Sequence, residues 1–176
     1  MKWILWRFLL RMSLVVLLGL VSPATAAETK PFYRDSYKSL VAAHVGQSLV
    51  VHFWSLTCMP CLVEMPRWGA LVQKRPDLKL VMVSTDSIDD APRIAGKLQH
   101  YGIGDVSSYA FADPFTERLN YEVAPDWRGE VPRTILVGRD GITETISGMV
   151  PEAFVIDWLD WQKDNDERRR GAAGGK

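Results

Sequence analysis

The sequence predicts an α/β fold in which a mixed central sheet is flanked by helices. Apolar, β-branched runs alternate with amphipathic runs in the order βαβαβα, followed by ββα, and this alternation is typical of helices packed on a sheet. The last two strands are joined by Arg139-Asp140-Gly141, a strong turn signal for an antiparallel hairpin. The 176 residues, 47% hydrophobic and 24% charged, suit one globular domain with short appendages.

The first half of the chain is arranged around a predicted buried strand at 49–54, which is apolar and rich in β-branched residues. Residues 28–44, which precede this strand, mix polar and apolar residues and are predicted to contain one short helix. A helix follows the strand and ends near Lys74. A second buried strand covers 78–85, and a helix over 87–102 ends at a glycine.

The second half is predicted to complete the sheet. Residues 109–112 form a short strand, and 113–121 form a short helix opened by an Asp-Pro pair. The hairpin pairs 134–137 with 142–146. A final helix starts at Pro151, and the predicted apolar face of this helix consists of Phe154, Trp158 and Trp161.

The only two cysteines, Cys58 and Cys61, lie where the first buried strand turns into a helix. Thr57 is the predicted N-cap, and Pro60 fits the first helical turn, where its missing N–H costs nothing. Unpaired N–H groups and the helix dipole favour a thiolate at this place. Cys58 is therefore predicted to be the exposed attacking thiol, and Cys61 the more buried thiol that resolves a mixed disulfide.

Three other interpretations of the cysteine pair are weaker. A disulfide that closes so short a loop would stabilise the fold by only about 2 kcal/mol. A structural zinc site needs four ligands, and the three histidines show no paired ligand spacing. Two ordinary core cysteines are the third alternative. Redox chemistry is the interpretation that we favour.

The stretch from Phe53 to Pro66, FW-x3-CxPC-x2-EMP, resembles the active site of the thioredoxin superfamily. Within it, the pattern is most similar to the bacterial TlpA/ResA group of exported thioredoxin-like proteins. The segment 130–134 resembles the cis-proline loop of that family, and the resemblance covers about residues 45–162. It implies a thioredoxin-like fold and a thiol–disulfide oxidoreductase that needs no cofactor besides the redox-active disulfide Cys58–Cys61.

The resemblance also implies a role for the proline loop. It implies that Pro132 acts with the cysteines and follows a cis peptide bond, which an X–Pro bond tolerates at modest cost. The backbone of Val131 would then pair with an extended substrate segment. A trans proline before a strand is the alternative. Met59, Pro60 and Trp54 are predicted to contact substrate, although core packing is the alternative for Trp54.

Two further residues are predicted to support the cysteines. His52 stands where thioredoxins often carry a buried acid, and it is a candidate base for the Cys61 proton. A buried histidine with an ordinary hydrogen bond is the alternative. Glu64 matches the family's EMP and is a candidate for tuning the cysteine pKa; a solvated carboxylate is the alternative. Arg133, directly after the proline, departs from the commonest family pattern.

The two ends of the chain are predicted to lie outside the domain at 27–162. Residues 1–26 combine a basic start, an apolar run and the small-residue pattern Ala24-Thr25-Ala26, which is typical of a secretory signal peptide. An uncleaved membrane anchor is the alternative, and only then would the protein contact the membrane. The polar residues 163–176 are predicted to be disordered.

The sequence thus predicts an exported, periplasmic thiol–disulfide oxidoreductase that reduces client proteins and receives electrons from a membrane thiol donor. The zero formal net charge offers no argument for a nucleic-acid partner. A periplasmic copper carrier that uses the same cysteines as soft ligands is the alternative function.

Overall fold

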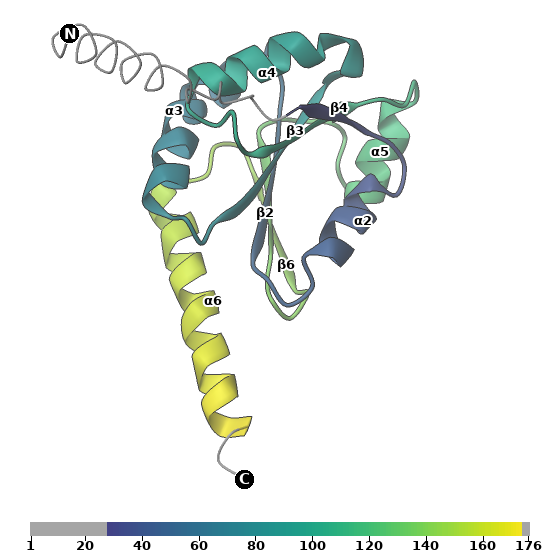
Figure 1. The fold of residues 1–176 in the computed structure, drawn as a ribbon. Helices are drawn as coiled ribbons and strands as arrows, with labels where there is room; N and C mark the ends of the chain where they lie inside the picture. Colours follow the sequence, from purple (N-terminus) through teal and green to yellow (C-terminus); the bar gives the residue numbers. More distant parts are fainter. Residues whose placement is uncertain (1–27, 174–176) are drawn as a thin grey trace, which may run out of the picture.

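The computed structural model describes residues 28–173 (Figure 1). Six strands form one sheet in the order β1-β4-β3-β2-β5-β6. Strands β1 to β4 pair in parallel, whereas β5 runs antiparallel to β2 and β6 runs antiparallel to β5. The strands are β1 (Thr29–Phe32), β2 (Leu49–Trp54), β3 (Lys79–Ser87), β4 (Ser107–Phe111), β5 (Arg133–Val137) and β6 (Thr143–Ser147).

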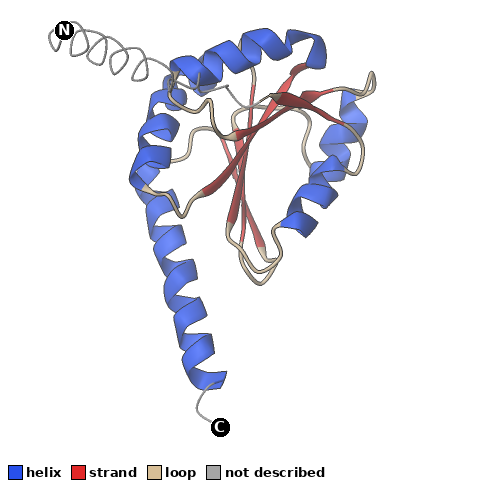
Figure 2. Cartoon of the chain, viewed as in Figure 1, coloured by secondary structure: helices blue, strands red, loops and turns tan. Residues whose placement is uncertain are grey.

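Helices cover both faces of this sheet (Figure 2). They are α2 (Ser36–Ala43), α3 (Met59–Lys74), the 3₁₀ turn η1 (Ile88–Asp90), α4 (Ala91–His100), α5 (Thr116–Val123) and α6 (Glu152–Ala173). Helices α3, α4 and α6 pack on one face over Val50, Trp54 and Met82. Helices α2 and α5 pack on the other face over Val51 and Phe53. The predicted mixed sheet flanked by helices is confirmed.

Strand β1 was not predicted. Its four residues show no strand pattern in the sequence, because only Thr29 and Phe32 are buried in the fold. The strand is specified by its neighbour, since Phe32 stacks on Phe111 of β4 at 5.6 Å between ring centroids. Pairing of this kind depends on a partner about eighty residues away, which no local pattern reveals.

The prediction of a disordered tail is wrong for residues 163–173, which continue helix α6. Polar side chains tie this part of the helix to the hairpin. Arg139 contacts Asp166 at 2.8 Å, and Arg170 contacts the same carboxylate from the next turn at 2.7 Å. Exposed charges can therefore extend a helix that the core has already nucleated.

Helix α6 also turns a different face to the core from the predicted one. Val155 and Leu159 are buried, whereas Trp161 is 54% exposed and Phe154 is exposed as well. Apolar residues follow two faces of this helix, and the aliphatic face is the one that packs against α3 and the sheet. Spacing alone does not choose between two such faces.

The predicted signal peptide or anchor lies outside the described residues. Between residues 28 and 173, no helix combines the length and the apolar character needed to cross a bilayer.

The close packing of α3 on the loop after α4 predicts a stability effect. A Cβ atom added at Gly69 would lie 2.0 Å from the carbonyl oxygen of Tyr101, a backbone atom. We expect Gly69→Ala to lower the free energy of unfolding by about 1–3 kcal/mol, measured by urea unfolding. Gly96→Ala in α4 is the control: its Cβ would meet nothing within 4 Å, so helix propensity should stabilise the protein by about 0.5–1 kcal/mol. Equal unfolding midpoints for the two variants would contradict this account.

Candidate active site

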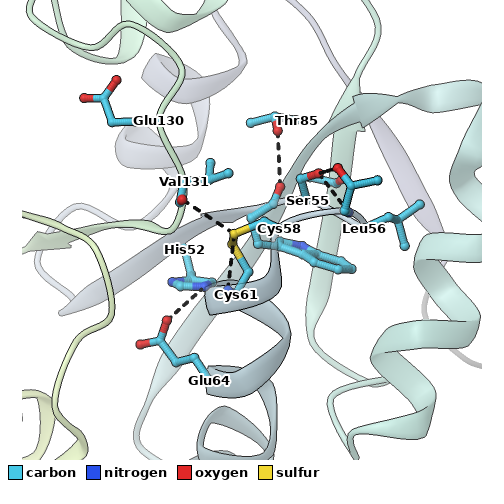
Figure 3. Close-up of a disulfide and its surroundings, with 12 residues drawn as sticks. His52, Ser55, Leu56, Cys58, Cys61, Glu64, Thr85, Glu130 and Val131 are labelled. Carbon is cyan, nitrogen blue, oxygen red and sulfur yellow. Dashed lines mark hydrogen bonds and ion pairs between the residues drawn. A yellow bond between two sulfur atoms is a disulfide. The ribbon is translucent and has the colours of Figure 1, made fainter.

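Cys58 and Cys61 form a disulfide at the junction of β2 and α3 (Figure 3). Cys58 caps α3, and its Sγ accepts a hydrogen bond from the Cys61 backbone N–H at 3.2 Å. Cys58 is partly exposed, whereas Cys61 is fully buried. The predicted N-cap, Thr57, is wrong: its hydroxyl pairs with Ser55 Oγ at 3.1 Å instead. Pro60 occupies the first helical turn as predicted.

The loop before Cys58 is held by Asp86, which follows the buried part of β3. Its carboxylate accepts the Leu56 N–H at 2.7 Å and the Ser55 hydroxyl at 3.1 Å. The Ser84 hydroxyl donates to the same carboxylate at 2.5 Å. Asp86 is not among the predicted site residues, although polar residues at the carboxyl end of one buried parallel strand lie beside the end of the neighbouring strand, here β2.

The predicted proline loop lies beside the disulfide. The Val131–Pro132 peptide bond is cis, as the resemblance implies, so the trans alternative is wrong. The carbonyl oxygen of Val131 lies 3.5 Å from Cys58 Sγ (Figure 3). The Pro132 carbonyl accepts the Gly148 N–H at 2.8 Å, which ties the loop to the end of β6.

Beneath the disulfide lies a buried pair, His52 and Glu64 (Figure 3). The Nε2 atom of His52 is 3.8 Å from Glu64 Oε2, and the two side chains are 0% and 1% exposed. The Nδ1 atom of His52 pairs with the Thr134 hydroxyl at 3.0 Å. Glu64 Oε1 accepts the Val150 N–H at 2.8 Å, so the alternative of a solvated carboxylate is wrong.

Burial shifts both titrations strongly. It lowers the pKa of His52 from 6.5 to about 3, because the charged imidazolium loses its hydration. It raises the pKa of Glu64 from 4.5 to about 7, and the hydrogen bond from Val150 offsets only part of that shift. At neutral pH, His52 is therefore uncharged, and Glu64 holds its proton far more readily than an exposed carboxyl does.

The predicted substrate contacts fall into two groups. Met59 and Pro60 are exposed beside Cys58, on the first turn of α3. Trp54 is 0% exposed and packs in the same core as Cys61, so the prediction that it contacts substrate is wrong. The reason is its place on β2, which has strands on both sides and helices on both faces. Trp127 is buried as well.

Among residues 28–173, no group of three or more His, Cys, Asp or Glu side chains is placed to hold a metal ion.

Comparison with known proteins gave matches among solved structures alone: no family model matches the chain, and no curated protein does. A thiol:disulfide interchange protein of the thioredoxin family from Chlorobium tepidum is 16% identical, with a TM-score of 0.57, over 80% of this chain and 99% of that one. DsbF from Mycobacterium tuberculosis is 19% identical, with a TM-score of 0.55, over 68% and 84% of the two chains.

A secreted M. tuberculosis disulfide oxidoreductase homologous to E. coli DsbE is 15% identical, with a TM-score of 0.53, over 68% of this chain and 84% of that one. Likenesses at these identities concern the fold, and they agree with the thioredoxin-like fold that the resemblance of the 53–66 stretch implies. The chain therefore has the predicted thioredoxin-like fold, with its cysteine pair at the start of α3.

Proposed function

We propose that this protein is a thiol–disulfide oxidoreductase that acts through Cys58 and Cys61. The observation that carries the proposal is the difference between the two sulfurs. Cys58 is partly exposed, and its Sγ receives an N–H hydrogen bond at the start of a helix, which stabilises a thiolate, while Cys61 lies buried behind it. The names of the similar structures, disulfide oxidoreductase and thiol:disulfide interchange protein, support the same activity.

The reaction proceeds in two exchanges. The Cys58 thiolate attacks one sulfur of a client disulfide, the client S–S bond breaks, and the leaving thiolate takes up a proton. Cys61, once deprotonated, attacks Cys58 Sγ and releases the second client thiolate. Two electrons pass from the protein dithiol to the client, which ends as a dithiol while Cys58 and Cys61 end as the disulfide.

Glu64 is better suited than His52 to take the proton of Cys61. Glu64 lies one helical turn after Cys61, and its pKa of about 7 lets its carboxylate accept a proton near neutral pH. His52, with a pKa of about 3, is a weak base. Its proposed role is to pack beside the carboxylate from β2, with Thr134 orienting the ring, while the Val150 N–H holds the carboxylate itself.

The client is proposed to bind as an extended segment. Val131 offers its backbone next to Cys58, and Met59 and Pro60 are exposed on the first turn of α3, directly after Cys58. The pattern of residues 1–26 supports export to the periplasm, where disulfide clients occur. In that oxidising compartment the Cys58–Cys61 disulfide must be reduced again after each reaction, and a membrane thiol donor is proposed to supply the electrons.

Insulin, whose chains are joined by disulfides, tests this function. The protein is reduced, freed of reductant and mixed with insulin, and the thiols on both partners are counted. We expect two protein thiols to be lost for each insulin disulfide reduced. No transfer from a folded, fully reduced protein would refute the proposal.

The direction of electron flow has its own measurement. Equilibration of the Cys58–Cys61 pair against glutathione gives its reduction potential, which we expect nearer to the thioredoxin value of about −270 mV than to the DsbA value of about −120 mV. A DsbA-like value would reverse the direction and make the protein an oxidase.

A further inference from the structure

Arg133 follows the cis-proline directly, and its side chain is only 4% exposed. It is the first residue of β5, where successive side chains point to opposite faces of the sheet. Thr134 turns toward His52 on the face that carries the cysteines. Arg133 therefore lies behind the sheet, on the face covered by α2 and α5.

There the guanidinium contacts the loop that leads into the proline. Its Nη2 lies 3.3 Å from Asp126 Oδ1, and its Nη1 lies 3.5 Å from Glu130 Oε1. Nη1 also donates to Ser147 Oγ on β6 at 3.4 Å. The planar group thus joins three acceptors from two segments, a geometry that arginine holds and lysine does not.

Trp127 supplies a rigid base under this contact. Its ring packs on Phe53 of β2, with 4.7 Å between centroids, and the Arg133 guanidinium lies 5.6 Å above the ring. The indole N–H donates to the Glu130 carbonyl at 2.8 Å. Trp127 therefore holds the peptide unit just before Val131 through its carbonyl, while Arg133 contacts the side chain of the same residue, Glu130.

We propose that Arg133 is a positioning residue that holds the Val131 backbone in place to bind an extended client segment beside Cys58. The inference rests on the proposed function, because Val131 matters only if a client pairs with it. Arg133 touches neither sulfur and acts through the loop over 126–131. It should therefore govern the binding of polypeptide disulfides and leave the reactivity of Cys58 unchanged.

Removal of the Arg133 guanidinium would leave no buried carboxylate without a partner. The side chains of Asp126 and Glu130 are 80% and 53% exposed, so both carboxylates stay hydrated without their partner. Arg133→Met keeps an unbranched apolar side chain at this buried position and removes the guanidinium that lies over Trp127. Arg133→Lys keeps the charge but loses the planar group with several N–H donors. It provides a milder variant if Arg133→Met folds poorly.

The experiment compares two disulfide substrates with the full-length protein: insulin is turned over with dithiothreitol as the recycling reductant, and the small disulfide reacts once with pre-reduced protein freed of reductant. Insulin requires a bound polypeptide segment, whereas 5,5′-dithiobis(2-nitrobenzoate) is a small disulfide that reaches Cys58 alone. For Arg133→Met we expect KM for insulin to rise about tenfold, with kcat and the rate toward the small disulfide within about twofold of wild type. The KM of Arg133→Lys for insulin should lie between the wild-type value and the value for Arg133→Met.

Arg139→Met is the matched control. Arg139 follows the opposite end of β5 and pairs with Asp166, so its loss should alter neither substrate's kinetics. An unchanged KM in both Arg133 variants, or an equal loss toward both substrates, would overturn the positioning role. A wild-type protein that reduces neither disulfide would instead refute the proposed function itself.

Discussion

Replacing Cys58 with serine is expected to abolish disulfide exchange, with a loss in kcat/KM on the order of 10³-fold or more. The reason is that Cys58 is the partly exposed cysteine of the pair, while Cys61 is 0% exposed. A serine oxygen at the same N-cap keeps the capping geometry, so the fold should survive. The loss is measured with insulin, and unfolding by urea serves as the control for stability.

Cys61→Ser should behave differently. Attack by Cys58 needs no second thiol, so this variant is expected to form a mixed disulfide with the client and to retain it. Mass spectrometry under non-reducing conditions detects that adduct. Alkylation of the reduced wild-type protein adds a second criterion, because Cys58 should react first and titrate below the free-thiol value of about 8.5. Faster alkylation of Cys61 would show that the two roles are reversed.

The buried pair should give the protein a pH dependence of stability with two opposing parts. Glu64 has a raised pKa, so its contribution to stability is complete below about 4.5 and is lost as the pH rises to about 7. His52 has a lowered pKa, so its contribution is complete above about 6.5 and is lost as the pH falls toward about 3. Each slope is about 1.4 kcal/mol per pH unit, and between pH 4.5 and 6.5 they cancel.

Single variants should reveal the two slopes. In Glu64→Gln, the free energy of unfolding should rise by about 2–3 kcal/mol from pH 4.5 to 6.5, because only the histidine term remains. In His52→Gln it should fall by a similar amount. Both glutamines keep a polar side chain where Val150 and Thr134 need a partner. The double variant supplies the background from all other groups, and urea unfolding at several pH values gives the curves. If the free energy of unfolding varied with pH in the same way in wild type and in both single variants, the pKa shifts assigned to His52 and Glu64 would be wrong.

Much of the site was predictable because its determinants are local. The apolar run of β2, the proline in the first turn of α3 and the spacing of Cys58 and Cys61 lie within eighteen residues of one another. Propensity, capping and helix periodicity act over that range. The proline loop came from a resemblance, and its position beside Cys58 matches what the resemblance implies.

What the sequence alone determined, then, is the α/β order of elements and the chemical character of the cysteine pair, because both follow from interactions between near neighbours along the chain. Only the tertiary structure decided the pairing of β1, the face of α6 that is buried and the helical structure of residues 163–173. It also decided that Glu64 is buried under Val150, that Asp86 holds the active-site loop and that Arg133 joins the proline loop to β6. The contacts that decide these features include pairs far apart in the chain, such as Leu56 with Asp86 and Glu64 with Val150. Their energies depend on how the layers pack rather than on any local pattern.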